Sequence, residues 1–330
     1  MNDAVRKVWF GDLGAGTREY IRGILSRHYV LDETADEPDY YIDNGCWYGH
    51  VAYDGCVKIA IISENSVPDF NAYDYAVAFD PLVFGDRYLR QPLFARSSAL
   101  PSLANRRLPA DEQLLNRNFC SMVVSNGVNR DPALQMFLDR IEKYKPVLSG
   151  GGWRNNVGGR VPDKVAFCRG CKFNLAFENS ASPGYTTEKI LDAYLSYSVP
   201  VYFGNPQIDV DFHAESMVCV KSKADVDRAV EEVMWLDSNP DAYLRKVKAP
   251  CLVRTKESYD EELEGFLAHV FSQPKEQAFR RCMFGYQATL RQHNRRALGT
   301  YQRLLNLHTG IHKTMRRIVT LGRRSCPARM

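Results

Sequence analysis

The residues best suited to chemistry lie in one segment, from Phe177 to Pro206, with the sequence FENSASPGYTTEKILDAYLSYSVPVYFGNP. An apolar run predicts a strand that ends at Phe177, and a loop rich in Ser, Pro and Gly follows it. The pattern then predicts a helix from about Thr186 and a second apolar strand. This order is typical of a βαβ unit, whose ligands bind beyond the carboxyl ends of the strands.

Glu188 and Lys189 stand in the first turn of this predicted helix. A cation there opposes the positive end of the helix dipole, so Lys189 favours an anion such as a pyrophosphate at the same place. Glu188 can accept hydrogen bonds from ribose or sugar hydroxyls. The alternative is that both residues are ordinary solvated charges at the start of a helix.

A second candidate is Glu64, which follows the apolar run from Val57 to Ile62. A carboxylate at the end of a strand can serve as a general base. The alternative is that Glu64 is an ordinary acidic residue on the surface. Three aromatic residues can stack on a sugar ring, and core packing is the alternative for each of them. They are Trp47, Tyr48 and Trp153.

Two short motifs resemble metal sites but are too weak to predict one. Asp209-Val210-Asp211 is an Asp-x-Asp sequence, and it lies after the segment described above rather than at the end of a strand before it. Cys168 and Cys171 have CxxC spacing, but a structural zinc site needs a second pair with similar spacing. We therefore expect no metal site.

The segment from Phe177 resembles the signature of the α-1,3/4-fucosyltransferases of glycosyltransferase family 10, which includes Helicobacter enzymes and the Lewis-type enzymes of animals. The matching motifs are Phe177-Glu178-Asn179, Gly184-Tyr185, Thr187-Glu188-Lys189-Ile190 and Val199-Pro200-Val201-Tyr202-Phe203-Gly204. Two earlier stretches resemble the bacterial family's N-terminal and middle blocks: Ile62-Ser63-Glu64-Asn65 and Val124-Ser125-Asn126 with Arg130. The resemblance covers roughly Val57 to Val220.

The resemblance implies an inverting transfer of L-fucose from GDP-β-L-fucose to the 3- or 4-hydroxyl of an N-acetylglucosamine-containing glycan, giving a Lewis-type product. Glu64 is then the general base. Donor binding is carried by Arg130, Asn179, Tyr185, Glu188 and Lys189, with Tyr185 stacking on or hydrogen-bonding to the nucleotide. No cofactor is required, and stimulation by a divalent metal stays open. Another nucleotide sugar is the alternative donor.

Short apolar runs alternate with amphipathic stretches along the chain, which predicts α/β structure with parallel sheets. We expect two Rossmann-like domains facing across a cleft, the GT-B type of glycosyltransferase fold. The run Ser149 to Gly152 is the predicted boundary. The expected parts are an acceptor-side domain over 1–150, a donor domain over 151–275 and a basic helical tail over 276–330.

The net charge of +4 divides unevenly along the chain. Residues 280–330 contain 12 basic residues and no acidic one, and the remaining 279 residues carry 31 basic and 39 acidic residues, a net −8. Apolar residues recur at helical spacing in the tail, which predicts docking on an anionic membrane surface. The alternatives are a solvated disordered tail and a nucleic-acid-binding module, and no motif for specific nucleic-acid recognition is present.

Composition also bears on location. No stretch reaches the ~18 uncharged apolar residues of a membrane-spanning helix, and the first residues lack the order of a secretion signal. Nine scattered cysteines favour a reducing compartment. We therefore expect a cytoplasmic protein, peripheral at the inner membrane face.

Overall fold

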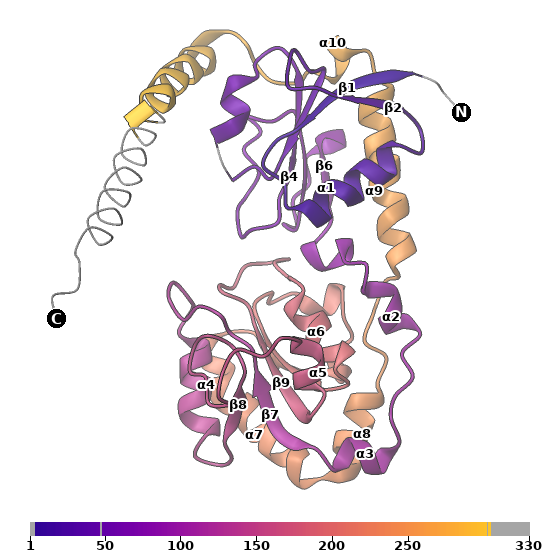
Figure 1. Cartoon of the computed structure of the whole chain (residues 1–330), viewed down its shortest axis with the longest axis vertical. Helices are drawn as coiled ribbons and strands as arrows, with labels where there is room; N and C mark the ends of the chain where they lie inside the picture. Colours follow the sequence, from indigo (N-terminus) through magenta and orange to yellow (C-terminus); the bar gives the residue numbers. More distant parts are fainter. Residues whose placement is uncertain (1–3, 47, 302, 305–330) are drawn as a thin grey trace, which may run out of the picture.

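The structure is a computed structural model that describes residues 4–46, 48–301 and 303–304. Its body consists of two α/β domains stacked one above the other, each built on a parallel β-sheet (Figure 1). This arrangement confirms the expected fold class of two Rossmann-like domains.

The first domain is a six-stranded parallel sheet with the strand order β2-β1-β3-β4-β5-β6. Its strands are β1 (Val5–Phe10), β2 (Val30–Glu33), β3 (Tyr40–Asp43), β4 (Val57–Ile61), β5 (Tyr75–Ala78) and β6 (Tyr88–Arg90). Two helices pack their apolar residues on one face of this sheet, α1 (Ala15–Leu25) and α9 (Lys256–Ser272). The chain therefore returns to its first domain after building the second.

The second domain is a five-stranded parallel sheet with the strand order β11-β10-β9-β7-β8. Its strands are β7 (Asn118–Met122), β8 (Val147–Ser149), β9 (Cys171–Phe177), β10 (Val199–Phe203) and β11 (Val218–Val220). Helices α4 (Ala133–Ile141), α7 (Val226–Ser238) and α8 (Pro240–Lys248) share its largest apolar core. Helices α5 (Lys164–Cys168) and α6 (Lys189–Leu195) pack together, and both contact β9.

Short helices and 3-10 turns make the remaining connections. Between the domains the chain forms η3 (Leu93–Arg96), α2 (Leu100–Ala104) and α3 (Asp111–Leu115). The other turns are η1 (Tyr48–Ala52), η2 (Gly85–Arg87), η4 (Ile208–Val210), η5 (Ala214–Ser216) and η6 (Lys223–Asp225). Leu100 and Leu103 of α2 pack in the same cluster as Ile190 and Leu191 of α6, so the connection is itself part of the second domain's packing.

The predicted domain boundary at residue 150 is wrong. Strands β7 and β8, at residues 118–149, belong to the second sheet, and α9 at the end of the predicted donor domain packs on the first. The glycines after Ser149 make a tight packing site instead of a linker, because a Cβ on Gly151 would lie 2.0 Å from the carbonyl oxygen of Val124.

The start of the predicted basic tail is part of the first domain. After α10 (Lys275–Ala278), Arg281 donates from Nε to Asp74 Oδ2 at 2.9 Å, and both side chains are fully buried. A helix then runs from residue 285 to 301 beside this domain (Figure 1). Two more arginines of the predicted tail pair with acids of the first domain: Arg280 with Asp86 and Arg295 with Asp54.

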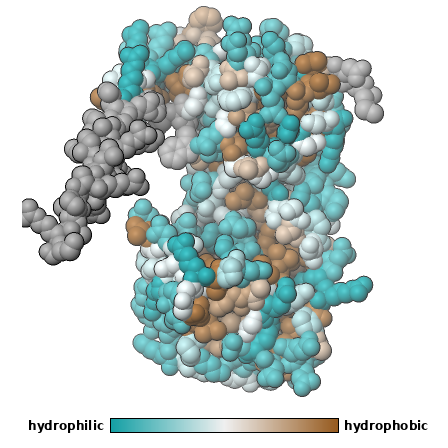
Figure 2. Space-filling view, viewed as in Figure 1, coloured by the Kyte–Doolittle hydropathy of each residue, from teal (hydrophilic) through white to brown (hydrophobic). Residues whose placement is uncertain are grey.

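The surface is mostly hydrophilic, and Figure 2 shows apolar residues on this face gathered where the two domains meet and over the lower domain. Across residues 4–46, 48–301 and 303–304, no helix combines the length and the apolar character that crossing a bilayer requires. Residues beyond 304, which hold half of the basic residues of the predicted tail, lie outside the described part of the chain.

Candidate functional site

Glu64 lies in the loop that follows β4, at the carboxyl edge of the first sheet. The buried side chain of Arg96 holds the start of this loop, since its guanidinium donates to the carbonyl of Ile62 at 3.0 Å and to Ser63 Oγ at 3.1 Å. Glu64 itself is exposed to solvent. The loop thus presents an exposed carboxylate beyond the end of β4, and the role of Glu64 as a base stays a prediction.

Four of the five predicted donor-binding residues line one pocket of about 240 Å³ in the second domain. These are Arg130, Asn179, Glu188 and Lys189. The pocket lies beyond the carboxyl ends of β7 and β9, where ligands of parallel sheets bind.

Arg130 brings an uncompensated positive charge to this pocket. Its Nη1 donates to Asn179 Oδ1 at 2.7 Å and its Nη2 to the carbonyl of Phe177 at 2.8 Å, and its buried Nε has no partner. No carboxylate of the described residues lies within salt-bridge distance of it, and burial lowers its pKa. A positive charge in this state favours an anionic ligand.

Lys189 is paired with a residue that the sequence analysis did not single out, Glu178. The Lys189 ammonium lies 2.7 Å from Glu178 Oε2, and the backbone N–H of Thr187 donates to Glu178 Oε1 at 2.7 Å. The Thr187 hydroxyl contacts both carboxylate oxygens, at 2.9 and 2.8 Å. Burial raises the pKa of Glu178, and the Lys189 ammonium and Thr187 act against that increase.

This network corrects the interpretation of the helix start. Helix α6 begins at Lys189, not near Thr186, and the anion that compensates Lys189 is the protein's own Glu178 carboxylate. The signal was present in the sequence, because an acid directly follows the apolar strand that ends at Phe177. Lys189 still lines the pocket and keeps about a quarter of its side chain exposed.

Tyr185 lies away from this pocket, at the contact between the domains. It is buried, and its ring packs edge-on against Phe79 of the first domain, with centroids 5.1 Å apart. The preceding Gly184 has a φ of 82°, and a Cβ there would lie 2.0 Å from the Phe79 carbonyl oxygen. In this arrangement the ring joins the two domains and is not free to stack on a nucleotide, whereas the alternative, a hydrogen bond from the Tyr185 hydroxyl to the nucleotide, stays a prediction.

Two polar contacts reinforce this junction. Asn65, next to Glu64, donates from Nδ2 to Ser180 Oγ at 2.6 Å, which brings the loops of Glu64 and Asn179 side by side. Arg90 at the end of β6 forms a bidentate pair with Asp211, with N–O distances of 3.0 and 2.6 Å. The Asp-x-Asp motif therefore contributes a structural ion pair between the domains.

The aromatic candidates have different outcomes. Trp47 lies outside the described residues, and of Tyr48 the structure describes the backbone, at the start of η1. Trp153 is half-buried against the second domain's core, and a Cβ on Gly127 would lie 2.2 Å from its ring. Trp153 thus supports the loop that leads to Arg130 and does not belong to the acceptor-side domain.

The described ranges contain no group of three or more His, Cys, Asp or Glu residues placed to hold a metal ion. Cys168 and Cys171 are both buried as free thiols. Cys168 accepts a hydrogen bond from Asn174 Nδ2 at 2.9 Å.

Two family models match the chain, one on each domain. The N-terminal domain of alpha-(1,3)-fucosyltransferase FucT matches residues 8–96, and the C-terminal part of glycosyltransferase family 10 (fucosyltransferase) matches residues 116–257. The gap between the two matches falls in the connection between the observed sheets.

Similar proteins include enzymes from bacteria and animals. Alpha-(1,3)-fucosyltransferase FucT of Helicobacter pylori is 34% identical over an alignment of 226 residues, and the match covers 59% of this chain and 47% of that protein. The human 4-galactosyl-N-acetylglucosaminide 3-alpha-L-fucosyltransferase 9 is 34% identical over 141 residues, 42% of this chain and 37% of that protein. The chain thus spans about half or less of the length of these relatives.

Crystal structures of alpha1,3-fucosyltransferase are similar over both domains. The complex with GDP has a TM-score of 0.70 at 28% identity and covers 82% of this chain and 91% of that one. The complex with GDP-fucose has a TM-score of 0.64 at 27% identity, with 81% and 91% covered.

Asp192 of α6, which lines the same pocket, predicts how the stability of the folded protein depends on pH. Burial raises the pKa of Asp192 to about 6, and Lys164, with its amine 3.9 Å away, offsets this only in part. Since the folded pKa lies above the unfolded value of ~3.9, ionising Asp192 costs the folded state stability as pH rises from about 4 to 6. Asp192→Asn removes that cost.

We expect Asp192→Asn to be more stable than the wild type by about 1–2 kcal/mol at pH 8, with the difference shrinking towards pH 4, as measured by urea denaturation. Asp139→Asn, at an exposed carboxylate on α4, serves as the control and should show little pH-dependent change. An Asp192→Asn effect of the same size at both pH values would contradict the assignment.

Proposed function

We propose that this chain, which belongs to glycosyltransferase family 10, the fucosyltransferases, transfers L-fucose from GDP-β-L-fucose to a 3- or 4-hydroxyl of an N-acetylglucosamine-containing glycan. One observation carries the proposal: a pocket with an uncompensated guanidinium on one domain adjoins a loop with a free carboxylate on the other. The product would be of the Lewis type, with the anomeric configuration inverted.

The donor side follows from the charges in the pocket. When the bond between fucose C1 and the phosphate oxygen breaks, negative charge grows on the departing GDP. Arg130 has no carboxylate partner among the described residues, so its positive charge can stabilise the negative charge on GDP as it develops, without any reorganisation of solvent. Lys189, held by Glu178, supplies a second cation, while Asn179 and Glu188 offer hydrogen-bonding groups to the sugar and ribose.

The acceptor side follows from Glu64. In an inverting displacement the acceptor oxygen attacks C1 from the face opposite the leaving GDP, and its proton must move to a base. Glu64 is an exposed carboxylate on the loop that touches the donor domain through Asn65 and Ser180, so it can take that proton. The reaction then yields the fucosylated glycan, GDP and a protonated Glu64, and it needs no cofactor.

The test of the function is turnover of GDP-fucose against a panel of type 1 and type 2 disaccharides, which differ in whether the 4- or the 3-hydroxyl of N-acetylglucosamine is free. Transfer to at least one of them is expected, and the preferred disaccharide reports the linkage. UDP-glucose and GDP-mannose serve as competing donors. Turnover with one of these and none with GDP-fucose would overturn the proposed donor.

Within the same assay, we expect Glu64→Gln to lower kcat by about 10² to 10⁴-fold, because it removes the base and leaves the donor pocket intact. Its affinity for GDP, measured by calorimetry, should change little. Lys189→Ala is the reciprocal variant and should weaken GDP binding. Near-normal turnover by Glu64→Gln would show that another group takes the proton.

We further propose that the protein docks at the inner, anionic face of the cytoplasmic membrane through residues 280–330. Exposed apolar side chains along the described start of this tail support the proposal: Phe284, Tyr286, Tyr301 and Leu304. Arg280, Arg281 and Arg295 are already paired with acids of the first domain. The charge available to lipid therefore lies mainly further along the tail.

Truncation after residue 304 tests this, because it removes six basic residues and keeps the buried pair of Arg281 and Asp74. The full chain should sediment with vesicles containing anionic lipid much more than with neutral vesicles, and the truncated chain should lose that difference. Added salt should release the full chain, since each basic residue near such a surface contributes ~1 kcal/mol of screened attraction. Equal binding to both vesicle types would contradict the electrostatic account.

A further inference from the structure

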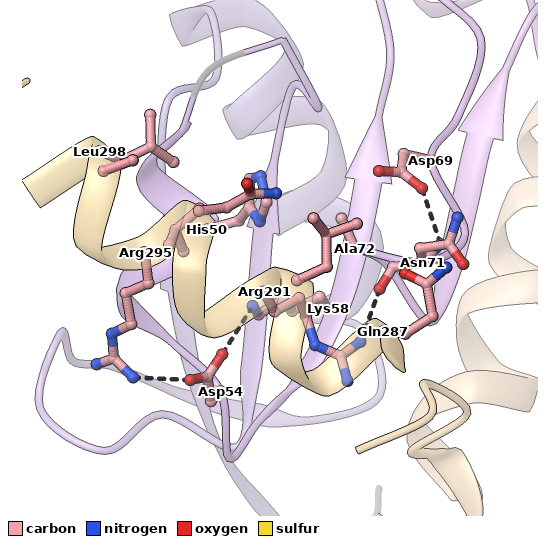
Figure 3. A pocket seen from close by; sticks show the side chains of 14 residues that line it. His50, Asp54, Lys58, Asp69, Asn71, Ala72, Gln287, Arg291, Arg295 and Leu298 are labelled. Carbon is pink, nitrogen blue, oxygen red and sulfur yellow. Dashed lines mark hydrogen bonds and ion pairs between the residues drawn. The ribbon is translucent and has the colours of Figure 1, made fainter. Parts of the chain in front are cut away.

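A second pocket, of about 460 Å³, lies between the first domain and the helix over residues 285–301 (Figure 3). One wall comes from β4, η1 and the segment before β5, and the other from one side of the helix. The proposed transfer reaction uses none of its side chains.

Lys58 of β4 is the most unusual side chain in this pocket. Its neighbours Val57 and Ile59 point into the core under α1 and α9, so Lys58 points to the opposite face of the sheet, where the pocket lies. It is 1% exposed, and no described residue accepts a hydrogen bond from its ammonium group. The nearest carboxylate oxygen, Asp54 Oδ1, is 3.9 Å away, and the other oxygen of that group accepts from Arg295 at 2.7 Å.

A buried ammonium without hydrogen bonds is unfavourable. Burial and, to a smaller extent, the nearby Arg281 lower the pKa of Lys58 to about 8. The group nevertheless remains mostly charged at pH 7. An anion in the pocket would supply the hydrogen bonds that the described residues do not, together with a closer counter-charge than Asp54.

The other charged groups leave the pocket with a net positive charge. Arg291 donates to the carbonyls of Asn71, at 3.0 Å, and Cys282, and no described carboxylate pairs with it. Lys58, Arg291 and Arg295 face Asp54 and Asp69, which gives a lining charge of +1. His50 does not add to it, because burial lowers its pKa to about 4. A ligand with one negative charge therefore complements the lining.

The rest of the lining suits a sugar. The amides of Asn71, Gln287 and Asn294 and the carboxylate of Asp69 offer donors and acceptors for hydroxyl groups. Val51, Ala72 and Leu298 add apolar surface against which a pyranose ring can pack. The volume falls in the range of ~300–1,000 Å³ typical of small-molecule pockets.

This pocket is separate from the reaction site. Lys58 is at the start of β4 and Glu64 lies beyond its end, and none of the residues that line this pocket also lines the donor pocket. The second site can thus be occupied while a donor and an acceptor react elsewhere.

We propose that this pocket is a second ligand site that binds an acidic sugar, with its single anionic group on Lys58 and Arg291 and its hydroxyls on the surrounding amides and Asp69. The anionic group is a carboxylate, whose single charge matches the lining, or a phosphate monoester, which carries nearly two charges at pH 7. The proposal stands on the pocket alone and is independent of the donor and acceptor of the transfer reaction.

The test is calorimetric titration of the full chain, without GDP-fucose, with glucuronate, glucose 6-phosphate and neutral glucose. At least one acidic sugar should bind, and glucose should bind at least tenfold more weakly. Lys58→Met should weaken the acidic sugar at least tenfold, while GDP affinity stays unchanged. Lys143→Met, at an exposed lysine of the other domain, is the matched control and should bind as the wild type does.

Lys58→Met should fold, because it removes a buried charge and keeps the length of the side chain, and its Tm should equal or exceed that of the wild type. Arg291→Gln, on the opposite wall, gives an independent second variant and should also weaken binding. If only one acidic sugar binds, it identifies the anionic group. No binding of either at ~10 mM, equal binding of glucose, or unchanged binding by both variants would overturn the proposal.

Discussion

The close approach of Gly184 to the carbonyl oxygen of Phe79 is the contact on which the rest of the site depends. No side chain fits there, and the positive φ of Gly184 directs Tyr185 into an apolar cluster of the first domain. The bidentate pair of Arg90 and Asp211 is a second contact between the domains and favours their observed relative orientation. Since the proposed base and the donor pocket lie on different domains, their relative placement depends on these contacts and on the hydrogen bond from Asn65 to Ser180.

Within the donor pocket, the buried Glu178 carboxylate decides how the positive charge is distributed. It takes the place at the start of α6 that an anionic ligand would otherwise occupy, and it neutralises Lys189. The charge offered to a pyrophosphate therefore comes chiefly from Arg130, whose partners are an amide and backbone carbonyls. A net charge of −8 over the body is thus compatible with binding an anionic donor, because the local charge decides.

The sequence predicted what depends on local pattern. The strand that ends at Phe177 and the strand before Glu64 follow from apolar periodicity. The grouping of Arg130, Asn179, Glu188 and Lys189 came from the resemblance to the fucosyltransferase family, and their shared pocket agrees with the rule that strand ends share an edge. Three features could not be predicted, because each depends on residues far apart in the chain: the burial of Tyr185 against Phe79, the pairing of Arg281 with Asp74, and the return of α9 to the first sheet. The glycines after Ser149 led to the wrong domain boundary for a related reason, since glycine is common both in linkers and where two backbones touch.

The most direct test of this account is a comparison of Gly184→Ala with Gly158→Ala. The two glycines have nearly the same φ, 82° and 85°, but a Cβ at Gly158 meets nothing within 4 Å. The backbone strain of the two variants is therefore matched, and they differ in the contact between the domains. Gly184→Ala should lower kcat for fucose transfer by about 100-fold while GDP affinity changes less than about threefold, because the donor pocket lies on one domain. Gly158→Ala should leave both kcat and the affinity for GDP at their wild-type values. A Gly184→Ala variant that transfers fucose at the wild-type rate would contradict the account.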